Sequence, residues 1–85
     1  MAQQRSSATL FDVPTGRSAV IATTNADRGL NRRLRELGLR PGARVSVLQK
    51  TAGGGRMVKV RNTTYALDAH ALKHILTAET SEAAS

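Results

Sequence analysis

The sequence predicts a mainly β protein, a small β-barrel of about five short strands with a short amphipathic helix between the first two strands and one helical turn before the last. Short β-branched segments recur at close spacing along most of the chain. Leucines at helical spacing interrupt them once, after the first segment. The chain has 85 residues, enough for one small domain with a thin margin of stability.

The two ends of the chain differ in character from its middle. Residues 1–9 are polar and small without periodicity, and residues 79–85 form a polar tail, so we expect both to be flexible. The barrel is expected over residues 10–78. Leu10-Phe11 is the first apolar pair, and it is expected to anchor the N-terminal segment on the barrel.

The predicted helix runs from about Arg28 or Leu30 to Leu37. Leu30, Leu34 and Leu37 are spaced by four and three residues, so they share one helix face. Asp27 is suited to cap the first turn. A helix of two to three turns is too short to be stable alone, so its leucines must dock on the barrel.

A glycine ends this helix sharply. We place Gly38 just after the helix in the left-handed conformation, with Leu39 packing back on Leu34 in a Schellman cap. Pro41-Gly42 then suits the central positions of a type II turn.

The remaining elements follow from alternation and turn residues. Val45 and Val47 are expected to face inward. In the next strand the inward pair is Val58 with Val60 or involves the alternation partners of Met57, and the sequence leaves this open. Asp68 is expected to cap one helical turn. The predicted strands are Arg17–Thr24, Ala43–Lys50, Arg56–Arg61, Tyr65–Leu67 and His74–Ala78, with a glycine hairpin loop at 51–55, a turn at Asn62–Thr64 and the helical turn at Ala69–Lys73.

The chain is strongly basic. It carries 13 Lys and Arg against 6 Asp and Glu, a formal net charge of +7. Such a field attracts phosphates, anionic lipid head groups or an acidic protein surface, although simple solubility explains it equally well. The sequence has no cysteine, no apolar run long enough to span a bilayer and no signal-peptide pattern, so we expect a soluble cytoplasmic protein.

A series of residues along most of the chain resembles the ferrous-iron transport protein A (FeoA) family, an SH3-like domain. Its most specific element is RRLRELGLRPG, residues 32–42. The other matching positions are Leu10, Gly16, Ala19-Val20-Ile21, Val45, Val58, Val60, Ala66-Leu67, Ala71 and Ile75. The resemblance implies an accessory protein of ferrous-iron transport that binds and regulates the cytoplasmic GTPase part of a FeoB-type membrane transporter. The same barrel resembles the C-terminal domain of iron-dependent repressors.

The sequence offers little that suits catalysis or metal binding. No nucleophile, histidine and carboxylate occur at credible spacing, so we expect no enzyme and no cofactor. His70 and His74 are four residues apart and are the weak candidates for a metal site. Two imidazoles alone make an incomplete ligand set, and His74 is expected to begin the last strand.

Partner binding is the remaining function. We expect the helix to present Arg32, Arg33, Arg35 and Arg40 outward, where arginine forks suit the carboxylates of a partner protein. A solvated charged face is the alternative interpretation of these arginines. A barrel that binds nucleic acid through phosphate contacts is the alternative function, although the chain has only Phe11 and Tyr65 for base stacking. The lack of aromatic residues also argues against a groove for proline-rich peptides.

Overall fold

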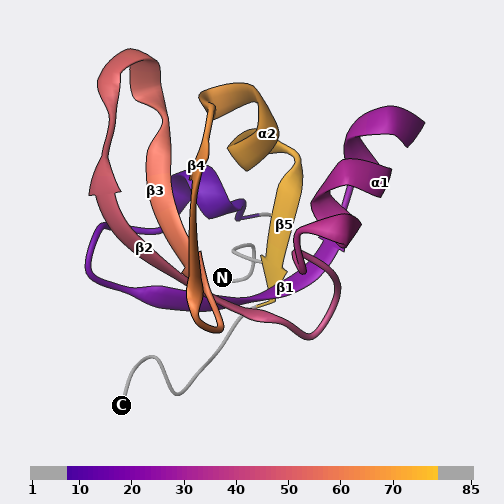
Figure 1. Ribbon diagram of the computed structural model, residues 1–85, viewed down its shortest axis with the longest axis horizontal. Helices are drawn as coiled ribbons and strands as arrows, with labels where there is room; N and C mark the ends of the chain where they lie inside the picture. The colour runs from indigo at the N-terminus through magenta and orange to yellow at the C-terminus, as the bar shows by residue number, and fades with distance from the viewer. Residues whose placement is uncertain (1–7, 79–85) are drawn as a thin grey trace, which may run out of the picture.

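The computed structural model describes residues 8–78. Of the flexible ends expected at 1–9 and 79–85, residues 1–7 and 79–85 lie outside this range, whereas Ala8 and Thr9 lie within it and bond to the last strand. Its strands and helices follow one another in the predicted order (Figure 1). The strands are β1 (Ser18–Thr24), β2 (Arg44–Lys50), β3 (Arg56–Val60), β4 (Thr63–Leu67) and β5 (Ile75–Ala78); the helices are α1 (Arg28–Glu36) and α2 (Ala69–Lys73), with 3₁₀ turns η2 (Leu10–Asp12) and η3 (Ala52–Gly54).

The five strands form one antiparallel sheet in the order β4-β3-β2-β1-β5. β-bulges between Ile21 and Thr23 and between Val47 and Gln49 shift the register, and bulges of this kind bend strands and increase their twist. The sheet curls into a nearly closed barrel, and α2 connects its two edge strands (Figure 1). The prediction of a mainly β barrel with two short helices is confirmed.

The core forms where the inward faces of the strands meet. Val45, Val47 and Val58 are fully buried and Val60 is nearly so, whereas Leu48 faces outward and is 44% exposed. This alternation is the one predicted for β2, and in β3 the structure selects Val58 and Val60 from the alternatives left open. Leu10, Ile21, Leu34, Leu39, Leu67, Ala71, Leu72 and Ile75 complete the core.

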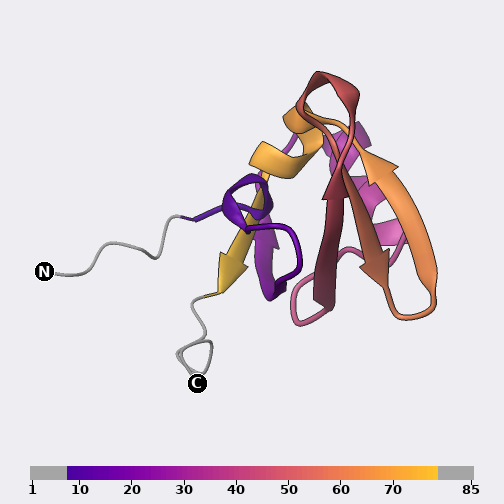
Figure 2. The same cartoon turned by 90° about the vertical axis from the view of Figure 1, so that its left-hand side faces the viewer.

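The N-terminal segment is held by η2. Leu10 is fully buried, Thr9 pairs with Leu76, and the backbone N–H of Thr77 donates to the carbonyl oxygen of Ala8 at 3.0 Å. Figure 2 shows η2 beside α2 and β5. Leu10 is therefore the buried member of the expected anchor, and Phe11 is only half-buried.

Two local predictions are wrong. The turn after β3 is Arg61-Asn62, and Thr63 already pairs with Val60 in the ladder, because β-branched threonines favour strand over turn. His74 does not begin the last strand. It caps the C-terminus of α2, and its backbone N–H donates to the carbonyl oxygen of Ala71 at 3.1 Å.

The glycine loop between β2 and β3 is tightly packed at its last residue. The backbone of Thr51 donates to the carbonyl oxygen of Gly55 at 2.9 Å, which closes the hairpin. A Cβ on Gly55 would lie 2.6 Å from the Thr51 Oγ1 and 2.7 Å from the Leu67 carbonyl oxygen. Gly55 is thus required by the close approach of β4.

Gly55→Ala should lower the free energy of unfolding by about 1–3 kcal/mol, as overpacking does. Gly29→Ala is the matched control, since a Cβ there has its nearest neighbour at 3.7 Å on the exposed face of α1. Alanine is the better helix former, so the control should raise stability by about 0.5–1 kcal/mol. Urea denaturation followed by circular dichroism measures both, and equal effects of the two substitutions would contradict the packing argument.

Leu34→Ala should destabilise the domain by about 2–5 kcal/mol, because Leu34 is the one fully buried leucine of α1. Leu30 and Leu37 are only half-buried, so their replacement by alanine should lower the free energy of unfolding by less. Leu48→Ala, on the exposed face of β2, is the control and should change stability by less than about 0.5 kcal/mol. The same denaturation experiment decides, and a Leu34 variant as stable as the Leu48 variant would show that α1 does not depend on this contact.

Candidate partner-binding surface

The start of α1 is fixed by side-chain hydrogen bonds. The Oδ1 of Asp27 accepts the backbone N–H of Leu30 at 2.8 Å, which is the predicted N-cap. The side-chain amide of Asn31 donates to the carbonyl oxygen of Ala26 at 2.9 Å. These bonds set the orientation of a helix of nine residues that is marginal by itself.

The end of α1 has the predicted Schellman geometry. The backbone N–H of Leu39 donates to the carbonyl oxygen of Leu34 at 2.8 Å, and that of Gly38 donates to Arg35 at 3.0 Å. Gly38 has φ +95°, and Leu39 is 1% exposed. The helix therefore ends at one defined residue, and the chain turns directly into the core.

A type II turn follows and is tied to the barrel. The backbone N–H of Ala43 donates to the carbonyl oxygen of Arg40 at 3.0 Å, and Gly42 has φ +91°, as this turn requires. The N–H of Gly42 also donates to Ile21 in β1 at 2.8 Å. The backbone that carries Arg40 is thus held rigidly against the sheet.

All four arginines of the predicted partner site are exposed: Arg32, Arg33, Arg35 and Arg40. Arg33 and Arg35 lie in the last turn of α1, where positive charge also favours the helix dipole. Arg35 and Arg40 line the groove described next, and Arg32 and Arg33 are not among its lining residues. Of the four predicted arginines, two therefore line the groove and two lie outside it.

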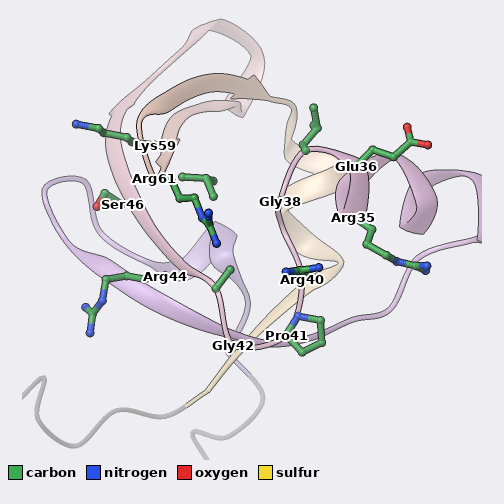
Figure 3. Close-up of a pocket in the computed structure, with 13 residues that line it drawn as sticks. Arg35, Glu36, Gly38, Arg40, Pro41, Gly42, Arg44, Ser46, Lys59 and Arg61 are labelled. Atoms are coloured by element: carbon green, nitrogen blue, oxygen red, sulfur yellow. The ribbon is translucent and has the colours of Figure 1, made fainter.

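A groove of about 920 Å³ lies between the end of α1 and the sheet. Leu37, Pro41, Ala43 and Val60 supply its apolar lining. We call it the basic groove, because five cations and one carboxylate from five segments of the chain also line it: Arg35, Glu36, Arg40, Arg44, Lys59 and Arg61. In Figure 3 Arg40 and Arg61 lie nearest its middle. Arg44 and Lys59 lie on its sheet side and Arg35 and Glu36 on its helix side, and these four side chains extend outward from its rim.

Sequence reasoning missed Arg44, Lys59 and Arg61 as site residues. The alternation of β2 does predict that Arg44 faces outward. What brings the three together is the antiparallel register, in which Val45 pairs with Val60 and Ser46 with Lys59. A single sequence carries no signal for that register.

Arg61 has a strained backbone. Its φ is +58°, the only positive value among the non-glycine residues of 8–78. It occupies the first position of the two-residue turn between β3 and β4, where glycine or asparagine is normally favoured. A bulky cation at this position lowers stability and places a guanidinium in the basic groove (Figure 3).

The cations of this surface have no carboxylate partners within the described chain. No basic nitrogen of residues 8–78 lies within 4.0 Å of a carboxylate oxygen. Arg56 is the one buried basic residue of this range. Its Nη1 donates to the carbonyl oxygens of Gly54 and Gly55 at 2.8 and 3.0 Å, and its guanidinium lies 4.7 Å from the centre of the Phe11 ring. Arg56 therefore holds the loop between β2 and β3 in place.

The two histidines come together on α2. The ring centres of His70 and His74 are 4.5 Å apart, and the Nδ1 of His74 is 2.8 Å from the carbonyl oxygen of His70. No group of three or more His, Cys, Asp or Glu residues in 8–78 is arranged to hold a metal ion. The pair supplies two of the four ligands that zinc usually takes.

These features define the class of protein. Five antiparallel strands curled around one small core, with two short helices, make a small SH3-like domain. None of its described helices is long and apolar enough to cross a membrane.

The chain belongs to the FeoA family, since the model of the FeoA domain matches residues 8–78. It is therefore linked to ferrous-iron transport. No curated protein matches the chain.

Solved structures agree with the family and the fold. FeoA of Stenotrophomonas maltophilia, solved in complex with zinc and described as a prokaryotic SH3 domain protein, is 33% identical over 82% of this chain and 88% of that one, with a TM-score of 0.72. FeoA of Chlorobium tepidum is 24% identical over 84% and 69% of the two chains, with a TM-score of 0.77. A manganese-dependent transcriptional repressor shares the fold at 19% identity and a TM-score of 0.79, over 92% of this chain and 39% of that one.

Arg61 provides a test of the strained turn. Arg61→Gly should leave the free energy of unfolding within about 1 kcal/mol of the parent, because relief of the left-handed strain offsets the added chain entropy of glycine. Arg61→Val should destabilise by about 1–2 kcal/mol, since a β-branched residue fits positive φ worst. Thermal and urea unfolding compare the two variants, and a valine variant as stable as the glycine variant would show that the turn is unstrained.

Proposed function

We propose that this chain is a cytoplasmic accessory protein of ferrous-iron transport, without enzymatic activity, that binds and regulates the cytoplasmic GTPase part of a FeoB-type membrane transporter. The observation that carries the proposal is the exposed arginine set at the end of α1, held on a rigid cap and turn. FeoA of Stenotrophomonas maltophilia, for which a role as a ferrous-iron transport activating factor has been suggested, supports it by similarity.

The arrangement suits a contact between proteins. Arg32, Arg33, Arg35 and Arg40 are exposed and have no carboxylate within ion-pair distance among residues 8–78. Complementary charge of this kind speeds association and selects the partner, and it weakens as salt rises. The apolar side of α1 is occupied by the barrel through Leu34, so the helix presents mainly charge.

Charge reversal at Arg32 and Arg33 tests the proposal. Arg32→Glu/Arg33→Glu should weaken binding to the transporter's cytoplasmic part by about tenfold or more at low salt, because two attractive charges become repulsive. The free energy of unfolding should fall by no more than about 1 kcal/mol, since Arg33 favours the helix dipole and both side chains are exposed. Surface plasmon resonance against the immobilised partner domain measures the affinity.

Lys50→Glu/Arg17→Glu is the matched control, since it changes the net charge equally at exposed residues outside α1 and outside the basic groove. It should weaken binding by no more than about twofold. Equal losses of affinity in the two double variants would show that the effect comes from net charge alone. Tight, salt-sensitive binding of DNA or RNA with no binding of the partner domain would favour the nucleic-acid function instead.

A further inference from the structure

The basic groove is a separate feature from the exposed face of α1 that carries Arg32 and Arg33. Its five cations and one carboxylate leave a formal charge of +4 around a space of about 920 Å³. We propose that the basic groove holds an extended acidic segment of the partner protein, with carboxylates on Arg40, Arg61 and Lys59 and an apolar side chain between them. The inference deepens the proposed function, because it names the chemistry of the segment that the partner inserts.

The lining favours a peptide. Leu37, Pro41, Ala43 and Val60 place apolar surface between the cations. A mixed lining of this kind buries a hydrophobic side chain while charged groups at its border fix the orientation. The volume is at the upper end of the range for small-ligand pockets and far exceeds a single anion.

The electrostatics favour separate carboxylates over concentrated phosphate. Phosphate sites commonly use backbone N–H groups at a helix N-terminus, whereas the groove lies at the C-terminal end of α1 with its negative dipole end. The Glu36 carboxylate also lies on the helix side of the groove (Figure 3). The helix dipole and Glu36 repel a compact dianion more strongly than they repel single carboxylates spaced along a peptide. Each of those carboxylates can pair with one arginine fork.

Arg61 adds an independent observation. Its φ of +58° is the single non-glycine departure into the left-handed region among residues 8–78, at a turn where glycine would be unstrained. The strained residue is also one of the cations that line the groove, together with Arg40 (Figure 3). A side chain that is kept at a conformational cost and faces a cleft is a candidate for binding.

The test uses the full chain and a defined probe. The probe is a fluorescein-labelled, twelve-residue peptide of aspartate and glutamate with two leucines, and its binding is followed by fluorescence anisotropy at low salt. Arg61→Gly and Lys59→Gln should each weaken binding by about three- to tenfold, the size expected for loss of one charge-assisted contact at a partly exposed site. Lys50→Gln, which removes an exposed cation outside the groove, should change the affinity by less than about twofold.

Three outcomes would overturn the inference. One is peptide binding that Arg61→Gly and Lys59→Gln leave unchanged, and another is no binding of the peptide to the parent protein. The third is binding of tripolyphosphate, single-stranded DNA or phosphatidylglycerol vesicles that is tighter than that of the peptide and depends on the same residues, which would assign the groove to phosphate groups. Arg61→Gly is expected to fold, and circular dichroism verifies this for every variant.

The transporter's cytoplasmic part gives a second arm that separates this inference from the proposed function. Binding of that domain that Arg32→Glu/Arg33→Glu weakens and Arg61→Gly leaves intact would overturn the groove and keep the proposed function. Absence of binding to the parent protein would overturn the proposed function, and the peptide measurement would then decide the groove by itself. Loss of binding in both the charge-reversal and the groove variants supports both.

Discussion

The functional surface depends on the hydrogen-bonded connection from Leu34 to Ala43. The helix before it has nine residues and is too short to persist alone. Leu34 and Leu39 bury the two sides of its Schellman cap, and the following turn is bonded to β1 through Gly42. A marginal helix thereby becomes part of the barrel, and the backbone that carries its charged side chains is held in place.

Among residues 8–78 one cation is buried and the others are exposed. Arg56 is buried, lies against Phe11, and donates to two loop carbonyl oxygens; it therefore contributes to the closure of the β2–β3 hairpin. The Lys73 Nζ lies 4.8 Å from the centre of the same ring. Cation–π contacts with a desolvated guanidinium are worth more than exposed ones, so Phe11 helps to stabilise a charge that would otherwise be costly to bury. The remaining cations of residues 8–78 are exposed, where repulsion among them is screened by water and salt.

Local signals predicted the fold well and the groove poorly. The caps at Asp27 and Gly38, the turn at Pro41-Gly42 and the alternation in β2 are encoded by neighbouring residues, and the structure confirms each of them. The two errors, at Asn62–Thr64 and at His74, fall at element boundaries, where neighbouring elements compete for the same residues. The basic groove instead depends on which strands pair and in what register, which one sequence without relatives does not specify.

The same contrast explains why the predicted arginines cover only part of the groove lining. Arg35 and Arg40 belong to the local motif and were named with it, whereas Lys59 and Arg61 reach the groove only because β3 lies beside β2. Arg61 is further hidden because a turn sequence of Arg-Asn gives no sign of a positive φ at arginine. Residues that violate a local preference are therefore invisible to rules built from local preferences. They become evident only when the backbone conformation and the cations of the neighbouring strands are seen together, and at Arg61 the proposal of a binding groove rests on that combination.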